Sequence, residues 1–500
     1  MQRPTRSPAP AVTAPRAGLS LPASLAATAA LAALTLAGCA AAERHVISKP
    51  YLYDPPSAET IFGEATFGTG ASKEAIAGIK PPPPPHSGPL SLDECLEIAR
   101  RVSPSLDSAQ QGELGAMWDR WSSITEFLPT GSTSYSVTQH DKDNSVAQTV
   151  GRRQYGWQVS FSQPLFTGGR NVANYYLSQL GVAAAKIQTS QALEDLLLAV
   201  KQAYYSILAT EKALDVAHTS VVNLQSHLAV AQNFYDVGMS PRNEVLQAEV
   251  ELANAQLEES TQARNLEVNR ARLNILLRRT HDAPLKIKDT LLYPRFPLTL
   301  ERCLELGLSN NPEIKLGRNQ VEAGARNVDM ARSALYPQLM LTYSQSSVGS
   351  TPRAHGGWSS DSSQWDIAAV ASWNFWEWGR AQAGVETSKV ALNQAVDALQ
   401  GLEDSATLEI ASNYQTLMSA GRNIDTSAKA VASAAEDLRM VTERYQEQVA
   451  TNTDVLDAQT RYSEAQYDYF SALYNYNLAW AGLERSLGQR VEPQAAPRSR

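Results

Sequence analysis

The sequence predicts a mainly α-helical fold built from a duplicated half-domain, with long antiparallel coiled-coil helices and four short strands. Three observations predict it: an internal repeat, very long helical segments, and paired segments of alternating polarity. The repeat is first spaced by 208 residues, so that Leu92, Cys95, Leu96 and Pro104 return as Leu300, Cys303, Leu304 and Pro312. This spacing far exceeds the roughly 20 to 50 residues of solenoid repeats, so it indicates two copies of one half-domain.

The helical segments are too long for a globular core. From Ala173 to Val237 there is no proline and a single glycine, which gives a helix of about 98 Å. Its apolar residues step by four and three in turn, as in a coiled coil: Leu193, Leu197, Val200, Tyr204 and Ile207. Two shorter helices, over 104–128 and 242–280, together match the long one and are expected to stack end to end beside it.

The predicted strands alternate large apolar with small polar residues. Ser134–Thr138 and Gln158–Ser162 both show this period of two, which suits a small transmembrane β-barrel with lipid outside and water inside. In the second copy the pattern is weaker. Tryptophans are expected at the strand ends, as an interfacial belt: Trp157, Trp365, Trp373, Trp376 and Trp378. The alternative is a soluble sheet with these tryptophans in its core. Four strands cannot close a membrane barrel, so the barrel reading requires an oligomer.

The N-terminus resembles a bacterial lipoprotein signal. Arginines precede an apolar stretch that ends in Leu36-Ala37-Gly38-Cys39, so residues 1–38 are expected to be a signal peptide and Cys39 the lipidation site. The alternative is an ordinary secretory signal with an incidental Cys39. We expect a lipidated extension and Pro-rich linker over 39–87, the first repeat over 88–288, the second over 289–488 and a disordered tail over 489–500.

Composition and motifs exclude several function classes. The net charge is −8, and there is no Lys/Arg stripe for nucleic acid. The sequence has no phosphate-binding glycine loop, no metal-spaced His/Cys cluster and no Gly-x-Ser-x-Gly, so we expect neither an enzyme nor a cofactor. Cys95 and Cys303 occupy equivalent repeat positions and are expected to be small buried apolar residues; a disulfide between them is the alternative.

Five strings resemble the TolC-type outer-membrane efflux family: Leu128-Pro129, Gln163-Pro164-Leu165-Phe166-Thr167-Gly168-Gly169-Arg170, Tyr336-Pro337, Asn374-Phe375-Trp376-Glu377-Trp378-Gly379-Arg380 and Asp454-Val455-Leu456-Asp457-Ala458. The resemblance implies a lipid-anchored homotrimer in the outer membrane of a Gram-negative-type bacterium. A trimeric α-barrel would extend into the periplasm, and four strands per protomer would form the β-barrel in outer-membrane lipid. It implies an exit duct for small molecules, served by a periplasmic adaptor (membrane fusion) protein and an inner-membrane pump. The alternatives are a type I protein secretion channel and a non-pore lipid-anchored coiled-coil envelope protein.

The resemblance also assigns roles at the two helix-hairpin tips. The implied periplasmic gate comprises Asn243, Glu244, Tyr445, Asp454 and Asp457, with Tyr445 and Glu244 hydrogen-bonded between helix pairs. Six aspartates of a trimer would favour cations and could bind a blocking divalent ion at Asp454 and Asp457; the alternative is that these aspartates only cap a helix. The implied adaptor-docking tip is Val237, Gly238, Met239 and Ser240. Two residues depart from the family pattern. Ala450 stands where the family often has an arginine that helps to hold the gate closed, and Gln448 stands where the second tip usually has a glycine.

Overall fold

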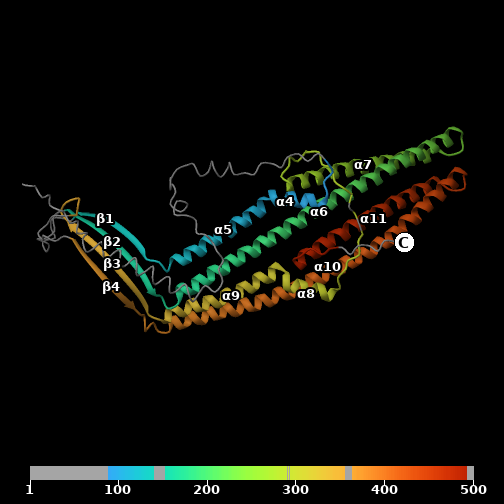
Figure 1. Ribbon diagram of the computed structural model, residues 1–500. Helices are drawn as coiled ribbons and strands as arrows, with labels where there is room; N and C mark the ends of the chain where they lie inside the picture. The colour runs from blue at the N-terminus through green and yellow to red at the C-terminus, as the bar shows by residue number, and fades with distance from the viewer. Residues whose placement is uncertain (1–87, 140–152, 290, 292, 355–362, 493–500) are drawn as a thin grey trace, which may run out of the picture. The chain divides into compact units, whose positions relative to one another are not determined.

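The computed structural model describes residues 88–139, 153–289, 291, 293–354 and 363–492, and the expected lipidation site Cys39 lies outside them. The same order of elements occurs twice (Figure 1). The first series is α4 (Leu92–Val102), α5 (Pro104–Thr125), β1 (Thr130–Gln139), β2 (Arg153–Phe166), α6 (Arg170–Asp236) and α7 (Arg242–Leu276). The second is α8 (Leu300–Asn310), α9 (Pro312–Arg332), β3 (Gln338–Gly349), β4 (Ser363–Ser372), α10 (Arg380–Gln446) and α11 (Asn452–Leu487), with a 3₁₀ turn, Ser333–Leu335, after α9. The predicted fold class is confirmed.

The short helices begin at sequence signals that both copies share. Ser91 accepts a hydrogen bond from the Glu94 amide, and Glu94 returns one to the Ser91 backbone, which forms a capping box. Thr299 caps the equivalent helix α8. The next helix of each copy starts with a proline, Pro104 or Pro312, whose missing N–H is not needed in a first turn.

Each long helix lies beside two shorter ones, as predicted (Figure 1). Helices α6 and α10 have 67 residues each; α5 and α7 pack on α6, and α9 and α11 pack on α10. The expected end of α7 at residue 280 was wrong. Arg278 takes a left-handed backbone with φ 56°, and the Arg279 amide donates to the Asn274 carbonyl, which closes the helix in the manner usual for a glycine.

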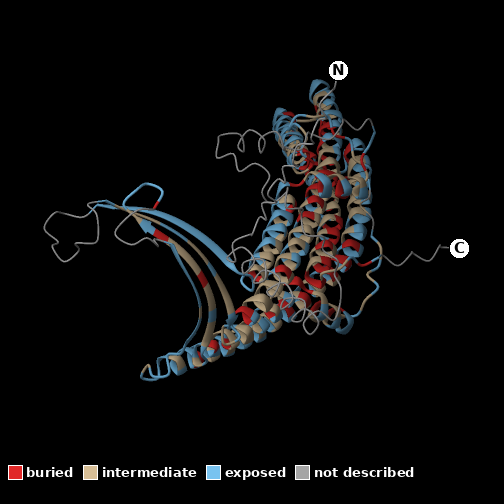
Figure 2. Cartoon of the chain, turned by 60° about the vertical axis from the view of Figure 1, so that its left-hand side comes forward, coloured by how far each residue is buried: buried red, intermediate tan, exposed pale blue. Residues whose placement is uncertain are grey.

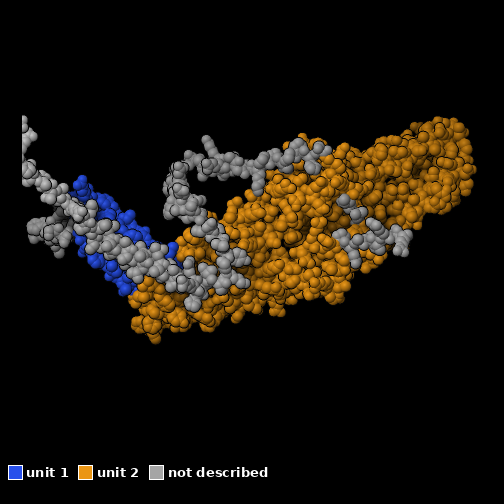
Figure 3. All heavy atoms as spheres, viewed as in Figure 1, with its two compact units in different colours: residues 1–73, 127–164, 340–370 blue, residues 74–126, 165–339, 371–500 orange. Residues whose placement is uncertain are grey.

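The chain divides into two compact units, coloured separately in Figure 3. One contains the strand segments within 127–164 and 340–370, and the other contains the helices. In Figure 2 the helices carry buried positions along their lengths, whereas the strands are mostly intermediate or exposed. No helix of the described chain is long and apolar enough to cross a membrane.

The helical unit contains two buried apolar clusters, one for each copy. Cys95 lies in the first and Cys303 in the second, and both are fully buried free thiols. The prediction of buried apolar cysteines is confirmed, and the disulfide alternative is wrong. Burial raises the pKa of Cys95 to about 12, with Glu94 adding to the rise, and burial raises the pKa of Cys303 to about 11.

A buried ion pair joins the two copies inside the helical unit. Lys201 of α6 is paired with Glu484 of α11, and their side chains are only 13% and 7% exposed. Glu484 also accepts hydrogen bonds from the Trp480 indole, at 3.2 Å, and from the Val491 amide, at 2.9 Å. These additional donors compensate part of the cost of removing the carboxylate from water.

The four strands form one sheet in the order β1-β2-β3-β4. Strands β1 and β2 are antiparallel and pair Tyr135 with Trp157, so Trp157 lies within a strand, not at its end as expected. Trp365 is the third residue of β4 and lies close to its start, as expected. Both are exposed in the protomer, by 36% and 60%, so the alternative of a soluble sheet with a tryptophan core is wrong.

Candidate functional site: the paired hairpin tips

The first tip is a tight turn between α6 and α7. Gly238 has a φ of 79°, a left-handed conformation that glycine adopts without steric cost. The amides of Met239 and Ser240 donate to the Phe234 carbonyl at 2.7 and 3.2 Å. The turn leaves Val237 and Met239 exposed by 67% and 56%, so apolar side chains form the end of the hairpin.

The second tip keeps this geometry without a glycine. Gln448 occupies the left-handed position with a φ of 59°, and the amides of Val449 and Ala450 donate to the Arg444 carbonyl at 2.8 and 3.2 Å. The departure at Gln448 therefore leaves the turn unchanged, at a conformational cost of about 1–2 kcal/mol. Val449 is 67% exposed, which gives this tip an apolar end too.

Tyr445 of α10 joins the two hairpins. Its hydroxyl donates to the Glu244 carboxylate of α7 at 3.4 Å, and its ring lies 5.1 Å from that of His227 and 5.5 Å from that of Phe234, measured between centroids. Tyr445 is 4% exposed. Burial, followed by the charge and hydrogen bond of Glu244, raises its pKa to about 12, so the phenol stays protonated and acts as a donor.

Two residues of this contact were missed by the sequence analysis. His227 of α6 donates through Nε2 to the Asn452 side-chain oxygen at 2.7 Å. Asn452, at the start of α11, donates to the Glu244 carbonyl at 3.4 Å and to the Gln247 side chain at 3.2 Å. Burial lowers the pKa of His227, although the Asn452 bond and Glu244 act in the opposite direction. His227, Glu244, Tyr445 and Asn452, here called the tip cluster, connect four helices.

A signal for His227 was present in the sequence. The residue lies on the buried seam of α6, which also contains Val221, Leu224 and Ala231. A polar residue on such a seam needs a partner to offset its desolvation, and it often fixes how helices pair. The seam could have indicated a buried imidazole, but not the helix that supplies its partner.

The remaining predicted gate residues are exposed in the protomer. The Asp454 carboxylate accepts from the backbone and the hydroxyl of Thr451, both at 2.8 Å. These bonds lower the pKa of Asp454 and complete a capping box at the start of α11. Asp457 lies one turn further on, and Asn243 lies in the first turn of α7. Asp454 therefore has a capping role whatever else it does.

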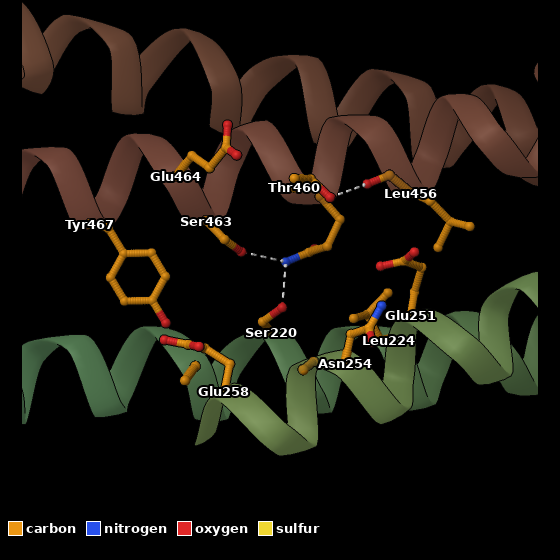
Figure 4. Close-up of a pocket in the computed structure, with 13 residues that line it drawn as sticks. Ser220, Leu224, Glu251, Asn254, Glu258, Leu456, Thr460, Ser463, Glu464 and Tyr467 are labelled. Atoms are coloured by element: carbon orange, nitrogen blue, oxygen red, sulfur yellow. Dashed lines mark hydrogen bonds between the residues drawn. The ribbon is translucent and has the colours of Figure 1, made fainter. Parts of the chain in front are cut away.

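A cavity of about 220 Å³ lies between α6, α7 and α11 (Figure 4). Gln459 bridges it by donating to Ser220 at 3.5 Å and to Ser463 at 3.2 Å. Tyr467 faces Glu258, and burial followed by that charge raises the pKa of Tyr467 to about 12. Within the described part of the chain, no group of three or more His, Cys, Asp or Glu is placed to hold a metal ion.

Comparisons with known proteins agree with this architecture. A family model described as outer membrane efflux protein matches residues 98–277 and 303–489. The toluene efflux pump outer membrane protein TtgF of Pseudomonas putida is 23% identical over 365 residues, which cover 72% of this chain and 75% of TtgF. The alkaline protease secretion protein AprF of Pseudomonas aeruginosa is 23% identical over 416 residues, which cover 79% of this chain and 83% of AprF.

The fold is also that of a solved outer membrane protein. The crystal structure of VceC from Vibrio cholerae superposes with a TM-score of 0.70 at 20% identity, and the match covers 80% of this chain and 96% of VceC. The family match spans well over half of the chain and includes both copies of the repeat. The chain therefore belongs to the outer membrane efflux protein family, whose members are channel proteins of the outer membrane and not enzymes.

Proposed function

We propose that this protein works as a homotrimeric exit duct, lipid-anchored through Cys39, that receives small molecules from an inner-membrane pump and a periplasmic adaptor. The proposal of a trimer rests on the sheet, whose two outer strands are β1 and β4. In a bilayer every backbone N–H and C=O needs a partner. The β1 edge of one copy can supply partners for the β4 edge of the next, and three copies close the ring.

The side chains of the strands support a lipid-facing surface. Tyr135, Val137 and Phe161 are exposed in the protomer by 54%, 57% and 42%, and they alternate with small polar residues such as Ser134 and Ser136. In a closed ring one set would face hydrocarbon and the other the water-filled duct. A non-pore envelope protein would gain nothing from this pattern.

The tips are the proposed contact with the adaptor. Val237 and Met239 of the first tip and Val449 of the second expose apolar area at the ends of the hairpins. Such area is unfavourable in water and is a common feature of docking surfaces. The first tip, Val237 to Ser240, is the proposed principal site. Its left-handed position is a glycine, Gly238, whereas the second tip has the strained Gln448 there.

The tip cluster and the two aspartates are the proposed gate. The Tyr445–Glu244 and His227–Asn452 bonds hold the hairpins of one protomer together. In a trimer, Asp454 and Asp457 would bring six carboxylates around the duct, which would favour cations and allow a divalent ion to block the current. The capping bonds of Asp454 use part of its carboxylate and leave its negative charge in place.

Two classes of transported substrate are each supported by a relative of known type. Similarity to a toluene efflux protein favours small apolar molecules, and this is our first candidate. Similarity to a protease secretion protein favours the second, protein export by a type I system. Deletion of the gene followed by a solvent-tolerance assay and an analysis of secreted protein would separate the two.

The duct and its gate are tested by single-channel recording of the purified protein in planar bilayers. We expect small cation-selective currents that divalent ions block from the helical side. Asp454→Asn combined with Asp457→Asn should lower the selectivity and abolish the block. Thr451→Ala is the matched control, because it removes the capping box but keeps both carboxylates. Equal effects of the two variants would refute the gate and leave only capping.

A further inference from the structure

The two copies of the repeat are joined by two ion pairs between α6 and α11. Lys201 of α6 is paired with Glu484 of α11, with side chains that are 13% and 7% exposed. On the same helices, Arg485 donates through Nε to the Asp195 carboxylate at 2.7 Å. Helix α6 thus supplies a cation and an anion, and α11 supplies the complementary anion and cation. These four residues are here called the charged junction.

The repeat places uncharged residues at all four equivalent positions. Helix α10 begins 210 residues after α6, and α11 begins 210 residues after α7. At this offset the equivalents of Lys201, Asp195, Glu484 and Arg485 are Ala411, Ser405, Asn274 and Ile275. The second set is here called the neutral junction. The charges therefore distinguish one pair of helices from the other on an otherwise duplicated backbone.

The apolar core does not make this distinction. Val200 and Ile207 of α6 are buried, and so are their equivalents in α10, Ile410 and Leu417. Since apolar attraction is non-directional, both long helices offer a similar surface to a returning helix. A charge does discriminate, because leaving it buried without its partner costs much more than burying the matched pair.

The charged junction is filled inside the chain, and the neutral one is open. Helix α11 packs on α6, whereas among the described helices α7 and α10 make no comparable contact. Leu408 of α10 and Ile275 of α7 are 72% and 62% exposed. Leu198, the equivalent of Leu408, lines a cavity of about 160 Å³ beside Lys201 and Glu484. By the repeat, the open face of α10 in one protomer therefore fits α7 of the next.

A contact between two first copies or two second copies, here called homotypic, would separate the charges from their partners. Where α6 met α7 of another protomer, Lys201 would face Asn274, an uncharged amide that already donates to the His281 and Ala283 carbonyls of its own loop. Where α10 met α11 of another protomer, Glu484 would face Ala411. Either contact buries a charge without its counter-ion.

We propose that the charged junction determines pairing: it makes the first copy accept only the second, so that the copies alternate around the trimer. The proposal rests on the homotrimer proposed above. A chain with two similar copies can close α6 on α11 or α10 on α7, and a ring that mixed these closures would contain homotypic contacts. The charges exclude such rings, so all three protomers close in the same way.

The test is disulfide crosslinking between protomers of the full-length protein. Within one chain Gln459 of α11 donates to Ser220 of α6 at 3.5 Å, and their equivalents are Glu249 and Ala430. Glu249→Cys with Ala430→Cys therefore reports an alternating contact, and Ser220→Cys with Glu249→Cys reports a homotypic one. With the native charges we expect dimer and trimer bands from the alternating pair only. No band from the alternating pair would reject the homotrimer itself, and the pairing rule with it.

A neutral variant then removes the charges without leaving one of them alone. It gives the charged junction the residues of the neutral one: Lys201→Ala, Asp195→Ser, Glu484→Asn and Arg485→Ile. Because α10 and α7 already fold with these residues, the variant should stay helical and keep the alternating adduct, while the homotypic adduct rises several-fold. A folded neutral variant without homotypic adduct would overturn the proposal.

Two further variants separate pairing from stability. Lys201→Arg keeps the charge and is the matched control, so it should give no homotypic adduct; an adduct as strong as that of the neutral variant would contradict the proposal. Lys201→Ala with Glu484→Asn keeps the pair between Asp195 and Arg485 and is the milder change. It should give an intermediate amount of homotypic adduct, and none would count against a role for the buried pair in sorting the copies.

Discussion

Acidification should loosen the hairpin tips through one imidazole, His227. Burial lowers the pKa of His227 in the closed tip, while in an opened tip the imidazole would return to about 6.5. The open form therefore binds a proton more readily, and the stability of the closed tip increases with pH where the open form titrates. It is fully present above about pH 6.5 and is lost as the pH falls, until His227 also protonates in the closed form.

The magnitude follows from linkage. Below pH 6.5 the free energy of opening should fall by at most about 1.4 kcal/mol for each pH unit, which is at most a tenfold change in the opening equilibrium. The groups that face His227 from the other helices are Glu244 of α7, Tyr445 of α10 and Asn452 of α11. Tyr445 stays neutral in this range because its pKa is about 12. The capping carboxylate of Asp454 has a lowered pKa, so its own contribution is lost only below its ordinary value of about 4.

The assay is hydrogen exchange of peptides from the two tips, corrected for intrinsic rates, between pH 7.5 and 5.5. Protection should fall below pH 6.5, by at most about tenfold per pH unit. The control is His227→Gln, which keeps an N–H donor for Asn452 but cannot take up a proton, and it should remove the pH dependence. Constant protection in the wild type, or the same fall in His227→Gln, would refute this reasoning.

Three further perturbations test other parts of the structure. Tyr445→Phe removes the long hydrogen bond to Glu244, so hydrogen exchange should show tip opening easier by about 0.5 kcal/mol, and an unchanged rate would mean that ring packing alone holds the contact. Gln448→Gly should raise thermal stability by about 0.5 kcal/mol, because relief of ~1–2 kcal/mol of strain exceeds the added backbone entropy of ~0.5–1 kcal/mol; a lower melting temperature would contradict this. Lys201→Met leaves Glu484 charged and unpaired in a buried site and should destabilise the protein to thermal unfolding by about 3–5 kcal/mol. Adding Glu484→Gln should restore most of that loss, and no recovery would show that the lysine acts through packing.

Much of the fold could be predicted from the sequence because its signals are local and repeated. Heptad spacing identified the long helices, and prolines with capping residues marked where short helices begin. The ends of helices were harder to predict than their starts. The left-handed residue that ends α7 is Arg278, and an arginine in the sequence does not mark a helix end as a glycine would. The position of Trp157 was wrong because the alternating polarity was recognised only from Gln158 onward, whereas β2 already begins at Arg153.

The candidate site was only partly predictable. Tyr445 and Glu244 were named through a family pattern, whereas His227 and Asn452 lie 225 positions apart and meet only because α6 and α11 pack together. No local pattern encodes that pairing. Asp454 shows a different difficulty. One carboxylate in the first turn suits both a helix cap and a charged ring, and a single protomer shows only the cap.

The open edges of the four-stranded sheet have a kinetic consequence. A single chain cannot pair the backbone N–H and C=O groups at the outer edges of β1 and β4. A newly exported protomer therefore has two exposed edge strands that can pair with any available strand. Completion of the sheet then depends on protomer concentration by mass action, and dilution favours the unfinished form. Chain synthesis and delivery to the outer membrane therefore have to keep pace with one another, because a protomer that waits alone is exposed to aggregation for as long as it waits.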